Sequence, residues 1–374
     1  MPKKFRSDDI SADSLRLLWL GHMHPFFPFR RSFAFLIINL TACFLMIALA
    51  IKGITISYNN DIFFVAECLQ TCNLMLHGVG KFLNLYFHRN GLQALLENRS
   101  KFWKIDDFKC ENIYEDLSGI TSTVKRGLRY YYCGALVVIF LFDLQPFATG
   151  LLPTGCYVPE GWFKGLTLTL WLLSISFFLI IQSTDGFFCS LSVAIVIQFK
   201  LLSHRFKNMH LLYAESERKM WKELKGLVDY HNFLTNYCKQ LNAAFAPIFL
   251  LQFLVSIVSA SVSIFIFMQP GAWSNRIKFV LYYLAIMVET SFYCVPAEII
   301  VNAASEIGNA VSDLDWYKIK INKVKKCFII ILARTQKTMV FTGYGLVNMN
   351  LQTFVIYVMT VFSFYTYLNS VRKI

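Results

Sequence analysis

Charged side chains are scarce in this 374-residue chain. Asp, Glu, Lys and Arg make up 16% of it, whereas soluble globular domains carry ~25%. Hydrophobic residues reach 56% and the mean hydropathy is +0.49. This composition excludes a soluble domain and indicates a protein that crosses a membrane several times. Residues 1–20 contain no long apolar core, so we expect no cleaved signal peptide there.

The chain also lacks the residue patterns of enzymes and metal sites. It has no CxxC or HExxH sequence, and no Ser-His-Asp set or carboxylate pair is arranged for catalysis. Most of the ten cysteines fall in apolar stretches, where Cys behaves as a small hydrophobic residue. Cys156 alone is a clear candidate for an outer loop, so no outer disulfide is expected. We therefore expect no enzyme activity, no metal and no cofactor.

The last hydrophobic stretch, Thr338–Val371, contains no charged residue. An uncharged apolar run of ~20 residues is typical of a membrane-spanning helix. Polar side chains recur within it at steps of three or four, which places them on one helix face. They are Thr353, Tyr357, Thr360, Ser363, Tyr367 and Ser370. The stripe has two interpretations: it lines a water-filled lumen, or its hydroxyls bond to their own helix or to a neighbour.

Seven stretches are apolar enough to span a membrane. They are Phe33–Ile51, about Ile62–Phe87, about Tyr130–Leu152, Gly165–Phe199, a segment within Gln240–Asn275, about Phe279–Val301 and Thr338–Val371. These spans place thirty Lys and Arg on one side and six on the other. Because basic loops stay in the cytoplasm, the amino terminus is expected inside and the carboxyl terminus outside. This distribution explains the net charge of +13, so nucleic-acid binding is not needed to account for it.

Two features predict a large cytoplasmic part. The helix expected over Gly165–Phe199 is longer than the ~30 Å apolar slab. The basic segment Trp316–Lys337 has an apolar stripe at helical spacing that includes Val324, Phe328 and Ile331. It is too charged to span. It could lie on the membrane surface or pack against other subunits below the bilayer, and we favour the second.

Carboxylates within the spans form a separate group. Asp185 either pairs with an Arg or Lys or is hydrated at the cytoplasmic interface, and the sequence leaves both alternatives open. Glu67, Asp143 and Glu289 have no obvious partner in the sequence.

The carboxyl-terminal part resembles the signature of insect odorant receptors. The resemblance is carried by Trp316-Tyr317, Arg334-Thr-Gln-Lys337, Thr342-Gly343, Thr353-Phe354 and Ser363-Phe364-Tyr365. The seven spans, with an orientation opposite to that of G-protein-coupled receptors, and the length of the chain agree with this resemblance. Related gustatory receptors have a Thr-Tyr pair, then five residues, then a Gln-Phe pair. Thr353-Phe354 and Thr360-Val361 stand there instead, which disfavours that branch.

The resemblance implies an all-α membrane protein of four parts: a cytoplasmic tail 1–32, a ligand-binding bundle 33–301, a cytoplasmic anchor 302–337 and a pore-lining segment 338–374. It implies an odorant-gated, non-selective cation channel in the plasma membrane of a sensory neuron. Its partners would be a small volatile ligand and a co-receptor subunit in a heterotetramer. The alternatives are a receptor that signals through a cytoplasmic protein without conducting ions, and a gustatory receptor channel.

The resemblance also implies two sets of site residues. Pore and gate positions would be Ser363, Tyr367, Ser370 and Val371; a tyrosine at 367, where the co-receptor looks aliphatic, favours a tuning subunit. Odorant-pocket candidates on spans two to six are Phe64, Cys68, Thr71, Cys72, Ile139, Phe142, Gln145, Phe177, Phe178, Ile181, Ser259, Ser263, Tyr282, Tyr283 and Ile286. For any single aromatic residue, plain helix packing is the alternative role.

The charge distribution generates a topology test. An epitope tag at Met1 should stain only after cells are permeabilised, and a tag after Ile374 should stain on intact cells, because the basic loops hold the amino terminus inside. Staining of the Met1 tag on intact cells would refute this orientation.

Overall fold

The computed structural model describes residues 10–58, 61–108, 112–209, 217–268, 273–314, 316, 322–336 and 339–371. In chain order its elements are α1 (Ala12–Leu20), α2 (Phe29–Ser57), α3 (Ile62–Phe87), α4 (Arg89–Asn98), η1 (Arg99–Lys101), η2 (Ile105–Phe108), α5 (Ile113–Asp143), α6 (Gln145–Thr149), α7 (Phe163–Phe177), η3 (Phe178–Gln182), α8 (Ser183–Lys207), α9 (Glu217–Phe267), α10 (Trp273–Ser312), α11 (Asn322–Thr335), β1 (Thr342–Gly343), β2 (Val347–Asn348) and α12 (Leu351–Val371).

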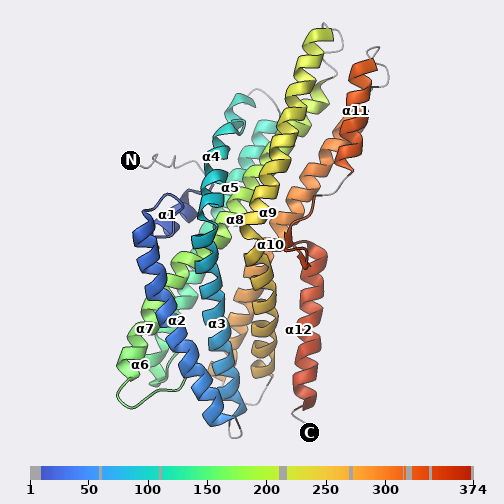
Figure 1. Ribbon diagram of the computed structural model, residues 1–374. Helices are drawn as coiled ribbons and strands as arrows, with labels where there is room; N and C mark the ends of the chain where they lie inside the picture. Colours follow the sequence, from blue (N-terminus) through green and yellow to red (C-terminus); the bar gives the residue numbers. More distant parts are fainter. Residues whose placement is uncertain are drawn as a thin grey trace.

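Long helices run roughly parallel to one another through the molecule (Figure 1). We call the end at which α4, α11 and the start of α9 lie the basic end. Six helical stretches of the described chain are long and apolar enough to cross a membrane, and Leu351–Tyr367 is a shorter apolar one. The helical, multi-span architecture expected from the sequence is therefore confirmed.

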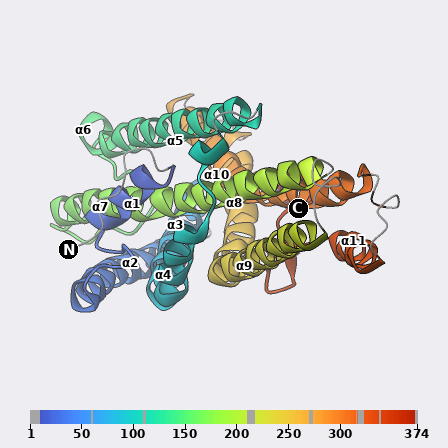
Figure 2. The same ribbon diagram turned by 90° about the horizontal axis from the view of Figure 1, so that it is seen from above.

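A rod formed by α7, η3 and α8 divides the bundle. Seen from above, α5 lies on one side of this rod and α2, α3 and α9 lie on the other (Figure 2). Nearly all of α8 is buried, and it packs against α9 and α10. The η3 segment is one π-helical turn within the rod. The prediction of one nearly continuous helix over Gly165–Phe199 is confirmed, although the helix runs further, from Phe163 to Lys207.

The amino-terminal segment is fixed to the basic end by α4. Arg89 at the start of α4 donates to the carbonyl oxygen of Pro25 over 2.8 Å and also to that of Phe27. His24 is buried beside it, and burial together with the charge of Arg89 lowers the pKa of His24 to about 4. His24 is therefore neutral at physiological pH. The rest of the predicted tail, residues 1–9, lies outside the described residues.

Two predicted spans had wrong boundaries. The third, predicted at about Tyr130–Leu152, corresponds to α5, which begins at Ile113 and ends at Asp143. The last span was predicted to be helical from Thr338, but a hairpin precedes its helix. Strands β1 and β2 pair antiparallel, and positive φ angles at Tyr344 and Gly345 make the turn.

The hairpin and the helix that follows have local causes. Gly343 packs so closely on α9 that a Cβ atom there would lie 2.8 Å from the backbone nitrogen of Leu250. Asn350 then caps α12, because its Oδ1 accepts from the Thr353 N–H at 2.7 Å.

The apolar stripe of the anchor segment packs inside its own chain. Val324, Phe328 and Ile331 on α11 are buried, and α11 lies against α10. The prediction that this stripe meets other subunits is therefore wrong for these residues, since the nearest apolar surface belongs to the same protomer. The predicted stripe also included Leu332, which is partly buried against the core, and Ile319 and Ile321, which lie outside the described residues, as does Lys337.

Lys81 and Asp185 are charged residues that are fully buried within the bundle. We expected Lys81 near the end of the second span, where a basic loop begins, but it lies inside the bundle, six residues before the end of α3. Its Nζ lies 2.5 Å from Asp185 on α8 and 2.5 Å from Glu289 on α10. Of the two alternatives for Asp185, pairing with a lysine is the one observed.

Tyrosines complete this ion cluster. Asp185 accepts hydrogen bonds from the Tyr131 hydroxyl at 2.9 Å and from the Tyr293 hydroxyl. Glu289 lies 3.3 Å from His77 Nε2 on α3. Charges within a membrane bundle are costly unless they are paired and hydrogen-bonded. The cluster therefore fixes the relative positions of α3, α5, α8 and α10.

The cluster yields a stability test. Lys81→Met leaves two buried carboxylates without a lysine partner, so the protein should lose about 3–5 kcal/mol of stability, seen as a lower unfolding temperature and less monodisperse protein in detergent. The triple variant Lys81→Met, Asp185→Asn, Glu289→Gln keeps the shapes without charge and should recover most of the loss. Lys164→Met, at an exposed position, is the control. A single variant as stable as this control would contradict a structural role for Lys81.

Candidate functional site

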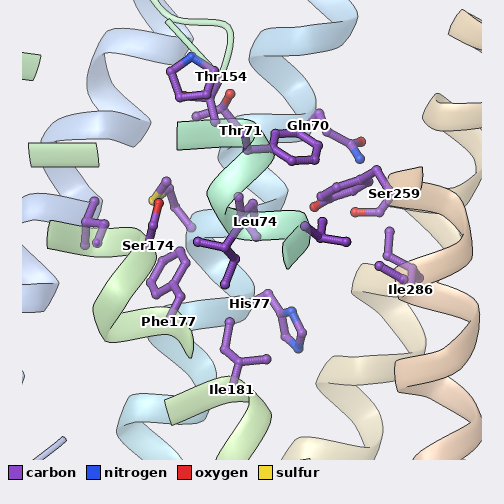
Figure 3. Close-up of a pocket in the computed structure, with 18 of the residues that line it drawn as sticks. Gln70, Thr71, Leu74, His77, Thr154, Ser174, Phe177, Ile181, Ser259 and Ile286 are labelled. Carbon is purple, nitrogen blue, oxygen red and sulfur yellow. The ribbon is translucent and has the colours of Figure 1, made fainter. Parts of the chain in front are cut away.

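A cavity of about 210 Å³ lies between α3, α5, the α7 and η3 parts of the rod, α9 and α10. The loop after α6 adds Pro153, Thr154 and Gly155 to its wall. Figure 3 shows Leu74 and His77 of α3 on one side, Ser174 and Phe177 of the rod on another, and Ile286 of α10 opposite. The π-helical turn η3 also lies in the wall, through Phe178, Ile181 and Gln182.

The structure brings together nine of the fifteen predicted pocket residues around this cavity. They are Thr71, Ile139, Phe142, Phe177, Phe178, Ile181, Ser259, Tyr282 and Ile286. Most are apolar and come from five separate helical segments. Such a lining suits a small, mainly apolar molecule held by a few polar groups.

The other six predicted pocket residues point elsewhere. Phe64 and Cys68 pack against Gly53 of α2, and Cys72 is half-buried against the core. Gln145 donates to the carbonyl oxygen of Leu152 at 3.4 Å. The remaining two do not line the cavity themselves: Ser263 accepts from Nε2 of the lining residue Gln70 at 3.3 Å, and Tyr283 packs in the cluster around Tyr357.

Sequence reasoning missed the polar wall that α3 supplies. Glu67, Gln70 and His77 all line the cavity, and Lys81 lies one turn beyond His77. Steps of three, seven and four place these residues on one helix face. That spacing was readable in the sequence, but we considered only Glu67 and Thr71 among the polar residues of this span and did not identify Gln70 and His77 as lining residues.

A polar seam joins the same helix to α9. Asn73 donates to the Val255 carbonyl oxygen at 2.8 Å and to the Ser259 hydroxyl. His77 Nε2 lies 2.9 Å from Gln252 Oε1, and Asn84 donates to the Ala244 carbonyl oxygen at 3.2 Å. Residues later in α3 therefore bond to residues earlier in α9. The two helices are antiparallel and held in register along the cavity.

His77 forms the floor of the cavity together with Glu289. Its Nε2 faces two oxygens, one of Glu289 and one of Gln252. Because Gln252 uses its Nε2 to donate to Ser256 at 3.0 Å, its oxygen is the atom that faces His77. His77 Nε2 therefore carries the proton and donates. The ion cluster around Lys81 lies directly behind this floor.

The opposite part of the cavity has its own charges. Glu67 lies 3.7 Å from Lys278. The Lys278 ammonium is 5.8 Å from the centre of the Phe142 ring and 5.6 Å from that of Phe279. Asp143 accepts from the Ser174 hydroxyl at 3.0 Å, and both residues line the cavity. These groups are suited to binding and orienting a ligand, and they form no arrangement for bond-breaking chemistry.

The predicted pore residues lie on a different part of the molecule. Ser363, Tyr367 and Ser370 are exposed on α12, which runs along α9 and α10 at the edge of the bundle (Figure 1). The two serine hydroxyls donate to carbonyl oxygens of α12 itself. Val371 ends the helix, and its side chain lies outside the described residues.

Tyr357 belongs to the packed side of α12 instead. It is fully buried, and its hydroxyl donates to the Ser256 carbonyl oxygen of α9 at 3.3 Å. The polar stripe read from the sequence is therefore divided: Tyr357 contacts α9, and Ser363, Tyr367 and Ser370 are exposed.

Comparison with known proteins agrees with this architecture. The family model described as 7tm Odorant receptor matches residues 61–362. The putative odorant receptor 85d of Drosophila melanogaster is 25% identical over 271 residues, which cover 65% of this chain and 62% of that protein. Odorant receptor 47b of the same fly is 23% identical over 269 residues, 67% of this chain and 64% of that protein. The chain thus matches less than two thirds of the length of these relatives.

The fold is also similar to a solved structure. The olfactory receptor OR5 of the insect Machilis hrabei, solved in complex with eugenol, superposes with a TM-score of 0.78 at 15% identity, covering 96% of this chain and 97% of that one. A second structure of the same receptor gives a TM-score of 0.72. Because the odorant receptor family model matches residues 61–362, most of the chain, this protein belongs to the insect odorant receptor family, multi-span membrane receptors rather than enzymes.

Proposed function

We propose that this chain is the ligand-tuning subunit of an odorant-gated, non-selective cation channel. A small volatile molecule would bind in the cavity and open a pore shared with a co-receptor subunit in a heterotetramer of the plasma membrane. The observation that carries the proposal is the cavity itself, closed in by five helical segments and lined mostly by apolar side chains. The structural relative solved with eugenol supports a ligand of this size class.

The pore is assigned to the exposed part of α12. Tyr367 is 60% exposed, and Ser363 and Ser370 are exposed on the same helix. Hydroxyl and phenol groups on a membrane helix are best accommodated beside water, since lipid offers no hydrogen bonds. Symmetrically placed subunits would bring these residues around a central lumen. A bulky Tyr367 fits a subunit that shares its pore with a different partner.

A chain of hydrogen bonds connects the cavity to α12. His77 on the cavity floor bonds to Gln252, and Gln252 donates to the Ser256 hydroxyl. That hydroxyl also lies 2.9 Å from the Thr290 hydroxyl, and the Ser256 carbonyl oxygen accepts from Tyr357. A ligand that moves the cavity wall would thereby act on the packed side of the pore helix. Gating requires that the ligand bind the open and closed states with different affinity.

The four-part organisation extends the proposal to the ends of the molecule. The tail 1–32 and the anchor segment 302–337 would lie in the cytoplasm, and the carboxyl terminus outside. Ile329 and Ile330 are 53% and 66% exposed on α11. They are the side chains of this segment that would contact neighbouring subunits, in place of the buried Phe328 and Ile331.

A change in the cavity should alter ligand preference. Phe142→Ala removes an aromatic wall and enlarges the cavity, so the concentrations needed for response should shift and the rank order of a panel of volatiles should change. Permeability ratios should stay as they are, because Phe142 is remote from α12. The measurement is whole-cell current with the co-receptor present, as dose–response curves and as reversal potential under bi-ionic conditions.

A change on α12 should have the opposite signature. Tyr367→Ala alters the width and polarity of the lumen, which set conduction, so permeability ratios or leak current should change while the odorant rank order is kept. Tyr344→Ala, an exposed tyrosine in the hairpin before α12, is a matched control. If Tyr367→Ala reorders the odorants and leaves permeation unchanged, α12 does not form the pore wall.

A further inference from the structure

The walls of the cavity contain more carboxylates than amines. Among the described lining residues, Glu67, Asp143 and Glu289 are acidic, and Lys278 is the one lysine. Behind the floor, Lys81 is shared between Asp185 and Glu289. Each end of the cavity therefore has two carboxylates for one lysine. An excess of negative charge within a membrane bundle is unfavourable unless a cation offsets it.

Asp143 is the lining carboxylate that lacks a basic neighbour. Glu67 has Lys278 at 3.7 Å, and Glu289 has Lys81 and His77. Within the part of the chain that the structure describes, Asp143 makes no ion pair, and its side-chain contact is the 3.0 Å hydrogen bond from Ser174. Asp143 is therefore the lining carboxylate that would stabilise an added cation most.

Two hydroxyl donors of the wall are used within the protein, whereas the Thr154 hydroxyl, which can donate or accept, has no hydrogen-bond partner in the described structure. Thr71 donates to the Glu67 carbonyl oxygen at 3.0 Å, and Ser174 donates to Asp143. A buried acceptor is left over in contrast: Gln70 is 8% exposed, lines the cavity, and its Oε1 has no hydrogen-bond partner in the described structure. A buried polar atom without a partner costs free energy, which a donor in the cavity would recover.

The protein already holds one ammonium group at this end of the cavity. Lys278 Nζ is placed by Glu67 and by the faces of Phe142 and Phe279. Carboxylates together with aromatic rings are the groups that stabilise organic ammonium ions. The remaining wall, with Leu173, Phe177 and Ile181, is apolar and suits a short hydrocarbon body.

We propose that the preferred ligands of this cavity are small primary amines, with Asp143 as the counter-ion of the ammonium group and Gln70 Oε1 as a further acceptor. An ammonium group has three donors and no acceptor, which complements a wall rich in free acceptors. Aldehydes, ketones and esters only accept hydrogen bonds and would leave these groups unpaired. This inference rests on the proposed ligand site and names its ligand class.

The test uses four probes that share one skeleton: 2-phenylethylamine, 2-phenylethanol, phenylacetaldehyde and propylbenzene. Binding to the purified full-length receptor in lipid nanodiscs is measured by calorimetry and by the shift in unfolding temperature. We expect the amine to bind at least about tenfold more tightly than the alcohol, with the aldehyde and the hydrocarbon weaker still. An aldehyde or hydrocarbon that binds as tightly as the amine overturns the inference.

Variants locate the counter-ion. Asp143→Asn retains the shape and the acceptor for Ser174 but removes the charge, so the preference for amine over alcohol should fall about tenfold. Glu160→Gln removes an exposed carboxylate outside the cavity lining and is the charge-matched control. An unchanged preference in Asp143→Asn overturns the assignment of Asp143. If that variant fails to fold, Gln70→Met tests the same preference through the second acceptor.

Currents recorded with the co-receptor separate this inference from the channel proposal. If the amine binds with the expected preference but none of the four probes evokes current, the channel proposal fails and the inference stands. If aldehyde or hydrocarbon evokes current and the binding series shows no preference for the amine, the inference fails and the channel proposal stands.

Discussion

The position of Lys81 between Asp185 and Glu289 is the interaction on which the rest of the bundle depends. Its Nζ lies 2.5 Å from each carboxylate, and the lysine is completely buried. A buried ammonium loses its hydration, so the two carboxylates must come from α8 and α10 to meet it. Two tyrosine hydroxyls complete the coordination of Asp185. Burial of one charge thereby dictates how four helices converge.

The cavity is the space left on one side of that convergence. Beyond the cluster, α3 is held to α9 by the seam from Asn84 to Gln70, whose polar side chains reach across to the neighbouring helix. On its other side α3 contacts the rod, where a Cβ atom on Gly78 would lie 2.4 Å from the Phe177 ring, so α3 is fixed against both neighbours. The π-helical turn at Phe178–Gln182 widens the rod at the same level. Polar groups that cost free energy to bury thus keep a ligand-sized space open.

Sequence reasoning predicted the helical spans and the family, because apolar length and composition are local properties of the chain. It also placed Thr71, Phe177 and Ile286 on the cavity wall. It failed for Phe64 and Cys68, since which face of a span turns inward depends on its neighbours. The partners of Lys81 lie 104 and 208 residues away, and no local pattern specifies them. The hairpin before α12 was missed despite Gly343 and Gly345, because the whole stretch was read for hydropathy alone.

The helices α9 and α10, which form part of the cavity wall, also pack against α12. Gln252 and Ser256 are one turn apart on α9 and both line the cavity, yet the backbone oxygen of Ser256 accepts from Tyr357 on α12. Thr290 of α10 joins the same network through its hydroxyl. A ligand therefore needs no long-range path to reach α12, because a single turn of α9 contacts both. Rotation or translation of that turn on ligand binding would necessarily change the packing of Tyr357, and with it the position of the exposed half of α12.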